Sequence, residues 1–350
     1  MSGLRHDTGA ARAHADRPRE SDRGAPPPSE PPAPLPAAPR EPTRERFANP
    51  LARYAAATRP AFLSVTLVGC LIGLAAARAD GVALETARAV LTVLAALVAH
   101  AAGNVINDYH DARSGADDAN TGRLFPFTGG SRFIQNGVLT LRETALFGYG
   151  MLALVVPVGL WLASTTGPGL LAIGAAGLAL GWAYSAPPLQ LVARGLSEAV
   201  IVLCWLLVVV GADHVQRGAF AWTPVAAGLG FALLVANILY INQFPDHDGD
   251  AAAGKRTLIV RLGAESAKWG YFGIALIAYG WLVLQVGRDN LPQACAAAAI
   301  TIVLSLNAAR ELREHASSPS ELGRAIRLTI AAALLHGLIV AAALALGWRA

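Results

Sequence analysis

From residue 60 onward, the chain alternates between long apolar runs and short polar connections. Each of nine runs holds about 17 to 22 residues, enough for a helix rising 1.5 Å per residue to cross a hydrocarbon core about 30 Å thick. Continuous apolar runs satisfy their backbone hydrogen bonds in lipid only as helices. The pattern therefore predicts an all-α, multi-pass membrane protein of about nine transmembrane helices around a central cavity, with spans at residues 60–77, 87–106, 143–163, 168–184, 196–212, 222–242, 267–286, 291–309 and 326–346.

Composition supports a membrane protein over two or three soluble domains. The 350 residues are 54% hydrophobic and only 15% charged. Because a charge at the bilayer centre costs roughly 2.5 to 3.5 kcal/mol, the positions of the charged residues carry information. The net charge of +4 comes from small basic groups without interleaved aromatic residues, so we expect no nucleic-acid partner. Cys70, Cys204 and Cys295 lie far apart in apolar runs, which is typical of buried hydrophobic residues.

The N-terminal segment has a different composition from the rest. Residues 1–47 hold ten prolines, many charges and no apolar run, so we expect a disordered cytoplasmic tail ahead of a membrane domain at 48–350. With the tail inside, the inner loops carry thirteen Lys and Arg residues and the outer loops with the C-terminus carry five. The positive-inside rule then predicts a bacterial-type plasma-membrane protein with a cytoplasmic N-terminus and an external C-terminus.

Seven of the thirteen aspartates fall in two short stretches, which follow the second and sixth predicted spans on the cytoplasmic side. In each stretch an Asn precedes an Asp by four residues, the spacing that places two side chains on one helix face. His100 and Asn104 continue the first face into the membrane, where a polar stripe must line an internal cavity. The two stretches are G-N-V-I-N-D-Y-H-D-A-R-S-G-A-D-D (103–118) and N-Q-F-P-D-H-D-G-D-A-A-A-G-K-R-T (242–257).

Carboxylate and amide oxygens at this spacing suit a hard divalent cation. Mg²⁺ is usually held by one or two carboxylates together with substrate phosphates. Two acidic stretches that face each other would therefore bind a Mg²⁺-bound diphosphate between them. Lys255, Arg256 and Arg132 are candidate ligands of phosphate oxygens. The competing interpretations are positive-inside loop charge for these cations, and helix capping and solvated loop charge for the aspartates. His100, His110 and His247 are candidate general bases, and Glu198 is explained equally well by helix capping.

With these residues in view, residues 55–345 resemble the UbiA superfamily of intramembrane aromatic prenyltransferases, which have nine transmembrane helices and two Asp-rich motifs. The first motif departs from the common N-D-x-x-D-x-x-x-D, because its third Asp follows Asp111 by six residues. This spacing looks like the branch that prenylates 1,4-dihydroxy-2-naphthoate in menaquinone synthesis. Three further stretches carry the resemblance: T-G-G-S-R-F-I-Q-N-G (128–137), Y-S-A-P-P-L-Q-L-V-A-R-G-L-S-E (184–198) and A-G-K-R-T-L-I-V-R-L-G (253–263).

The resemblance also implies roles for individual residues. It implies Mg²⁺ as the cofactor and a polyprenyl diphosphate and an aromatic acceptor as substrates. The implied metal ligands are Asn107, Asp111, Asp246 and Asp250, with Asp117 close by. Lys255 is assigned with Asn107, Asp111, Asp246 and Asp250 to catalysis, and the predicted substrate-binding residues are Arg59, Asn104, Asp108, Asp117, Arg132, Tyr184, Ser185, Asn242 and Arg256.

The expected reaction is transfer of a polyprenyl group to an aromatic ring, after the allylic C–O bond ionises in a cavity that excludes water. Y-S-A-P-P (184–188) also occurs in chlorophyll-type synthases, so 4-hydroxybenzoate and a chlorin stay open as acceptors. A divalent-cation transporter is the alternative from another class. A transporter would be expected to place its ligands near the bilayer midplane on broken helices, which this pattern does not predict.

Overall fold

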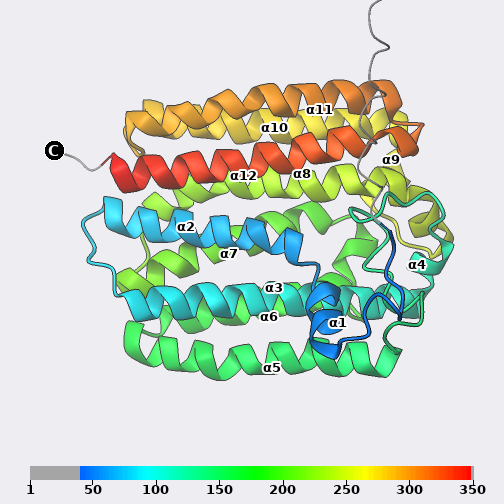
Figure 1. The fold of residues 1–350 in the computed structure, drawn as a ribbon. Helices are drawn as coiled ribbons and strands as arrows, with labels where there is room; N and C mark the ends of the chain where they lie inside the picture. Colours follow the sequence, from blue (N-terminus) through cyan, green and yellow to red (C-terminus); the bar gives the residue numbers. More distant parts are fainter. Residues whose placement is uncertain (1–39, 348–350) are drawn as a thin grey trace, which may run out of the picture. The chain divides into compact units, whose positions relative to one another are not determined.

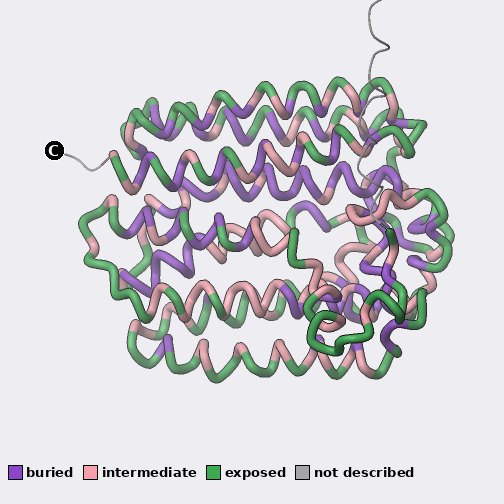
Figure 2. The backbone as a smooth tube through the Cα atoms, viewed as in Figure 1, coloured by how far each residue is buried: buried purple, intermediate pink, exposed green. Residues whose placement is uncertain are grey.

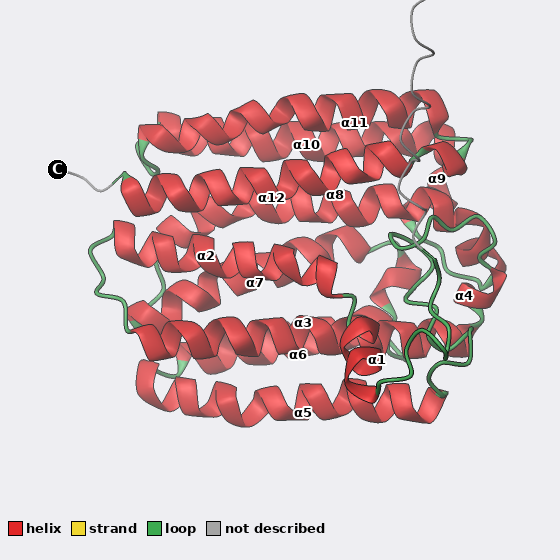
Figure 3. Ribbon diagram, viewed as in Figure 1, coloured by secondary structure: helices red, strands yellow, loops and turns green. Residues whose placement is uncertain are grey.

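The computed structural model describes residues 40–347, and these residues form helices and loops without a strand (Figures 1 and 3). Eight helical spans in this part of the chain are long and apolar enough to cross a membrane, and a ninth apolar helix, α6, has 17 residues. The prediction of an all-α membrane protein is confirmed. The long helices are α2 (Leu63–Ala79), α3 (Thr86–Ser114), α5 (Leu141–Thr166), α6 (Gly169–Ser185), α7 (Ser197–Arg217), α8 (Thr223–Ala252), α10 (Ala264–Gly287), α11 (Ile302–His315) and α12 (Gly323–Leu346).

Short elements connect these helices. Before α2, α1 (Pro50–Ala57) is capped by the Asn49 side chain, and a 3₁₀ turn at Pro60–Phe62 follows. The span that ends in α11 begins as the 3₁₀ helix Gln293–Thr301. Most loops, with α4 (Ala116–Ala119) and α9 (Leu258–Leu262), gather at one end of the helices (Figures 1 and 3). The remaining 3₁₀ turns are Leu191–Arg194 and Pro319–Glu321.

Two helices extend well past the spans that hydropathy predicts. α3 continues from the expected end at residue 106 to Ser114, where Gly115 takes a left-handed conformation (φ 77°) and stops it. α8 continues from 242 to Ala252, with Pro245 inside the helix. Both extensions carry Asp residues, because these turns leave the apolar layer and no longer need apolar side chains. The acidic stretches are therefore largely helical ends rather than loops.

The buried core lies between α2, α7, α8, α10 and α12, and α8 is buried along most of its length (Figure 2). Glycines let these helices approach closely. A Cβ on Gly73 of α2 would lie 2.2 Å from the backbone oxygen of Val209 in α7 and 2.9 Å from the Cβ of Ala212. Small residues at such crossings drive helix association in membranes through close van der Waals packing.

The predicted tail at 1–47 lies mostly outside the described residues. Its last part, residues 40–47, is described and makes specific contacts: the ring of Phe47 packs 5.1 Å from that of Phe133. The described domain therefore begins before residue 48.

We expect Gly73→Val to lower the apparent melting temperature of the detergent-solubilised protein. Over-packing a close helix crossing costs about 1–3 kcal/mol, and here the added side chain meets backbone that cannot rotate away. The matched control is Gly280→Val in α10, because Gly280 is exposed and no atom lies within 4 Å of its ideal Cβ. Equal melting curves for the two variants would contradict the α2–α7 crossing.

Candidate active site

The two acidic helix ends meet at one lysine. The Nζ of Lys255 lies 2.7 Å from Oδ1 of Asp111 on α3 and 3.5 Å from Oδ1 of Asp250 on α8. The Lys255 side chain is only 11% exposed. Burial alone would lower the pKa of Lys255, but Asp111 and Asp250 raise it above its ordinary value. The ammonium therefore stays charged and joins the two acidic stretches, which lie close enough to act on one small ligand.

The α3 side of this cluster is tied to α6 by an amide. Asn107 Nδ2 donates to Oδ2 of Asp111 at 3.2 Å and to Oγ of Ser185 at 2.9 Å. The first of these bonds confirms that the four-residue spacing places Asn107 and Asp111 on one helix face. The second bond brings in Ser185 at the C-terminal end of α6, directly after Tyr184. Residues of the sequence motifs at 103–118 and 184–198 are thus in direct contact.

On the α8 side, Asp246 is held by a residue that the sequence analysis missed. Asn120, just after α4, donates from Nδ2 to Oδ1 of Asp246 at 2.5 Å. The backbone of Asn120 lies against α8, where a Cβ on Gly249 would come within 2.8 Å of the Asn120 Cα. These two partners are 126 residues apart in sequence. Asn120 does follow the first acidic stretch closely, but no spacing rule relates it to Asp246.

Asp108 and Asp117 face a tight turn at 128–131. Oδ1 of Asp108 accepts from the backbone N–H of Ser131 at 3.2 Å, and Gln135 Nε2 donates to Oδ2 of Asp117 at 3.4 Å. A Cβ on Gly130 (φ 71°) would lie 2.6 Å from that Asp117 oxygen, so the turn requires glycine. Burial, and then the charges of Asp111 and Asp108, raise the pKa of Asp117 to about 8. Crowded carboxylates of this kind favour a bound cation.

The two predicted phosphate-binding arginines are placed differently from Lys255. Arg132 is buried, donates from a terminal nitrogen to the Asp117 carbonyl oxygen, and has Nε 3.9 Å from Glu41 Oε2. Arg256 is exposed, and its backbone N–H bonds to Ala193. Among these three cations, Lys255 is the one whose side chain contacts the carboxylates of the predicted acidic residues. Phosphate binding by Arg132 and Arg256 stays a prediction.

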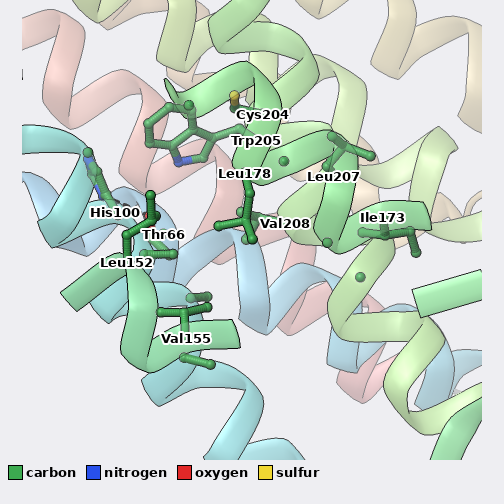
Figure 4. Close-up of a pocket in the computed structure, with 18 of the residues that line it drawn as sticks. Thr66, His100, Leu152, Val155, Ile173, Leu178, Cys204, Trp205, Leu207 and Val208 are labelled. Carbon is green, nitrogen blue, oxygen red and sulfur yellow. Dashed lines mark hydrogen bonds between the residues drawn. The ribbon is translucent and has the colours of Figure 1, made fainter. Parts of the chain in front are cut away.

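A cavity of about 660 Å³ opens between α2, α3, α5, α6, α7 and α8, and its wall is mainly apolar (Figure 4). Its lining extends along α3 from Thr92 to Asn107, about 22 Å at 1.5 Å per residue. At mid-depth, His100 Nδ1 lies 2.8 Å from Oγ1 of Thr66, and its ring meets the Trp205 ring edge-on at 5.0 Å. Asn107 both lines this cavity and bonds to Asp111, so the acidic cluster borders one end of it.

Loop carbonyls hold the other polar residues at this end. Arg59, in a left-handed conformation (φ 56°), donates to the Phe127 carbonyl oxygen at 3.0 Å, and its guanidinium lies 4.6 Å from the centre of the Phe62 ring. Asn242 donates to the same oxygen at 3.4 Å. Asn104 donates to the Thr58 carbonyl oxygen at 3.0 Å. Arg59, Asn104, Asn107, Tyr184 and Asn242 all line the cavity, so the structure brings these five predicted residues together.

The other candidate bases lie apart from the cavity wall. His110 Nε2 is 3.1 Å from the Tyr149 hydroxyl, and His247 pairs with Asp248 at 2.8 Å. Glu198 accepts a hydrogen bond from Gln243. Of the residues named as possible bases, only His100 lines the cavity.

The donor set fits a hard divalent cation. Within residues 40–347, no three His, Cys, Asp or Glu side chains form a ready cation site, and the Lys255 ammonium lies between Asp111 and Asp250. The site nevertheless supplies the carboxylate and amide oxygens that Mg²⁺ prefers. Asn120 Oδ1 and Asn242 Oδ1 are also buried without a hydrogen-bond partner. Asn107, Asp111, Asp117, Asp246 and Asp250 stay the predicted ligands of such an ion.

This combination defines a class: a helical membrane protein whose acidic and basic groups cluster at one end of a long apolar cavity. The chain belongs to the UbiA prenyltransferase family, whose sequence model matches residues 66–322. The resemblance seen in the sequence is thus confirmed, and the chain is a prenyltransferase of this family.

Relatives and solved structures agree with this assignment. A 1,4-dihydroxy-2-naphthoate octaprenyltransferase of Mycobacterium tuberculosis is 31% identical over 259 residues, which cover 73% of this chain and 85% of that protein. A protein of the same description from Bacillus subtilis is 25% identical, over 65% of this chain and 71% of that protein. A UbiA homologue from Archaeoglobus fulgidus bound to GPP and Mg²⁺ superimposes with a TM-score of 0.52 at 16% identity, covering 83% of this chain and 99% of that one. This last match shows a shared fold.

We expect Lys255→Met to lower the apparent melting temperature in a metal-free, chelator-containing buffer. The substitution leaves the half-buried Asp111 and the buried Asp250 without their cation, and removing one partner of a buried pair costs about 3–5 kcal/mol. Added Mg²⁺ should recover more of the loss in this variant than it adds to the wild type, because it would neutralise the same carboxylates. Arg310→Met, at a 71% exposed side chain, is the control. A Lys255→Met curve that matches the control, with or without Mg²⁺, would contradict this electrostatic role.

Proposed function

We propose that this prenyltransferase moves a polyprenyl group from polyprenyl diphosphate to 1,4-dihydroxy-2-naphthoate, with Mg²⁺ as its cofactor. The observation that carries the proposal is the position of Lys255, between two acidic helix ends at the polar end of a long apolar cavity. An amphiphile with a diphosphate head and an isoprenoid tail matches that distribution of polar and apolar groups. The names of the mycobacterial and Bacillus relatives support this acceptor.

In the proposed reaction the head group binds among Asn107, Asp111, Asp246, Asp250 and Lys255. When bound, Mg²⁺ would neutralise negative charge that develops on the leaving diphosphate. The Lys255 ammonium would add to this from within the protein, where a fixed and desolvated charge acts more strongly than in water. Ser185 and Asn107 keep the α3 and α6 ends together, so that their polar atoms need little rearrangement when the substrate binds.

The apolar wall has two roles in this proposal. It holds the isoprenoid tail, and it keeps water from the allylic carbon once the C–O bond to diphosphate has broken. The acceptor ring then forms the new C–C bond. With dihydroxynaphthoate, the ring carbon that accepts the prenyl group loses its carboxyl group as CO₂. Trp205 and His100 supply aromatic edges in the cavity against which a planar acceptor could lie.

A cation-transport function is less consistent with the charges at the opposite end of the helices. Asp80 and Asp213 lie there, but Arg217 pairs with both at 2.7 Å. These carboxylates are neutralised by an internal partner. An ion path would need a second open acidic site, and this pair does not provide one.

We expect membranes that contain the protein to release diphosphate and form a prenylated, decarboxylated naphthoquinol from a long-chain polyprenyl diphosphate, Mg²⁺ and 1,4-dihydroxy-2-naphthoate. Asp111→Ala and Asp246→Ala should each lower this rate by about 100-fold or more, which is the size expected for groups that orient a metal-bound substrate. Asp248→Ala is the matched control, since the Asp248 side chain is 97% exposed. Product formed from 4-hydroxybenzoate or a chlorin, but not from dihydroxynaphthoate, would refute the proposed acceptor and leave the proposed prenyl transfer intact. Full activity of both alanine variants would refute the proposed role of these aspartates in binding Mg²⁺ and diphosphate.

We also propose that the acidic helix ends face the cytoplasm and that α12 ends on the external side. In a bacterial host, a membrane-impermeant maleimide should label Asp289→Cys in intact cells, but Ser318→Cys only after permeabilisation. Both positions are exposed and lie in connections at opposite ends of the helices. A chain with Cys70, Cys204 and Cys295 replaced by Ala provides the background. The reverse labelling pattern would invert the proposed orientation.

A further inference from the structure

Residues 40–47, which we call the N-terminal strap, bind to the loop between α4 and α5. One anchor is apolar: the ring of Phe47 packs on the ring of Phe133, next to Val138 and Leu139. The other anchor is a single carboxylate, Glu41. The strap precedes α1 and does not belong to any predicted membrane span, and its contacts lie on the loop that covers the acidic cluster.

Glu41 gathers three partners from this loop. Its Oε1 accepts from Arg123 Nε at 2.7 Å, its Oε2 accepts from Asn136 at 3.1 Å, and the same Oε2 is 3.9 Å from Nε of Arg132. Burial tends to raise the pKa of Glu41, but the hydrogen bonds from Arg123 and Asn136 outweigh it and lower that pKa. Asn136 also donates to the Pro42 carbonyl oxygen, which fixes the backbone of the strap.

From Arg123 the contacts continue to the second acidic stretch. Arg123 donates from a terminal nitrogen to the carbonyl oxygen of Asn120 at 2.7 Å, and Asn120 donates from its side chain to Asp246. Gly129 (φ 74°) leaves room for the Arg123 side chain, because a Cβ there would lie 2.7 Å from the Arg123 Cβ. One unbroken series of hydrogen bonds therefore runs from Glu41 through Arg123 and Asn120 to Asp246.

The charges around Glu41 also support a role for this residue in ordering the loop. Glu41 compensates two guanidinium groups, of which Arg132 is buried and also holds the Asp117 carbonyl oxygen. Glu41 also accepts from Arg123, so this one carboxylate holds both guanidinium groups of the loop in place.

We propose that Glu41 is a positioning residue for the head-group site: it orients Arg123, which holds Asn120, which in turn fixes Asp246. The inference rests on the proposed function of Asp246 in binding Mg²⁺ and diphosphate. Such outer partners of ligating groups typically contribute about 10- to 100-fold to affinity or activity. Glu41 itself does not line the cavity.

The first test asks whether Glu41 holds Arg123, and it needs no substrate. Trypsin in limited amount should cleave the full-length protein after Arg123 faster in Glu41→Gln than in the wild type, as read from fragment masses. Glu45→Gln is the matched control, because Glu45 lies in the same strap, is exposed, and forms no hydrogen bond or ion pair through its side chain within residues 40–347. Equal cleavage in all three proteins would overturn the proposal.

The second test asks whether the effect reaches the head-group site. Glu41→Gln should weaken binding of tritiated geranylgeranyl diphosphate in the presence of Mg²⁺ by about tenfold. The KM for the acceptor should stay within about twofold, since Glu41 acts on the head-group end alone. Arg123→Gln should weaken diphosphate binding by a similar factor. The double variant should bind no more weakly than the weaker-binding single variant, because the effects of substitutions within one series of contacts do not add.

The outcomes separate this inference from the proposed function. Wild-type affinity for the diphosphate in Glu41→Gln, or additive losses in the double variant, would overturn the role of Glu41 while leaving the transferase proposal intact. If the wild type binds the diphosphate but prenylates no acceptor, the proposed function fails while the binding comparison still decides the role of Glu41. A lower melting temperature together with a higher KM for both the diphosphate and the acceptor would indicate a general folding defect. This outcome would also contradict a positioning role for Glu41.

Discussion

The structure depends on a charge constraint: carboxylates on two separate helices must share cations in surroundings of low permittivity. Two unit charges 4 Å apart interact by about 4 kcal/mol at an effective dielectric constant of 20, and like charges repel as strongly. Lys255, with its Nζ 2.7 Å from Asp111 and 3.5 Å from Asp250, therefore offsets the repulsion between these two carboxylates. The short link after α8 makes this possible. The Lys255 N–H bonds to the Asp250 carbonyl oxygen at 2.8 Å, and Gly254 takes a left-handed conformation (φ 74°) that folds the chain back.

The same constraint explains why the loops at this end are well packed. One carbonyl oxygen, that of Phe127, accepts hydrogen bonds from Arg59 of the N-terminal part and from Asn242 of α8. The loop is in turn held by Asp108, which binds the Ser131 backbone, and by Glu41. Polar groups that would otherwise be buried without partners are thus satisfied by segments far apart in sequence. A site with several carboxylates close to lipid needs such a cover, because each unpaired group is costly there.

Sequence patterns predicted the helical spans and several contacts of the site, for identifiable reasons. Apolar length reports the spans directly, and the four-residue spacing of Asn107 and Asp111 is a local property of one helix. Hydropathy could not find the ends of α3 and α8, because the last turns of both helices are polar. Asn120 and Glu41 were missed, since their partners are set by how loops fold over the bundle. Arg132 is predicted from its position to bind phosphate, but the sequence did not indicate that its side chain contacts the backbone of Asp117.

The distribution of polar groups within the cavity also restricts how a substrate can bind. Arg59, Asn104, Asn107, Tyr184 and Asn242 lie at one end of the wall, while the part along α7 toward Val215 is apolar. An amphiphile with an anionic head would lose the hydration of its charge in the reverse orientation and gain no partner for it. For the proposed polyprenyl diphosphate this favours one binding direction, with the allylic carbon just inside the polar end. In the proposed reaction the acceptor would meet that carbon between the polar end and the depth where His100 and Trp205 interrupt the aliphatic wall.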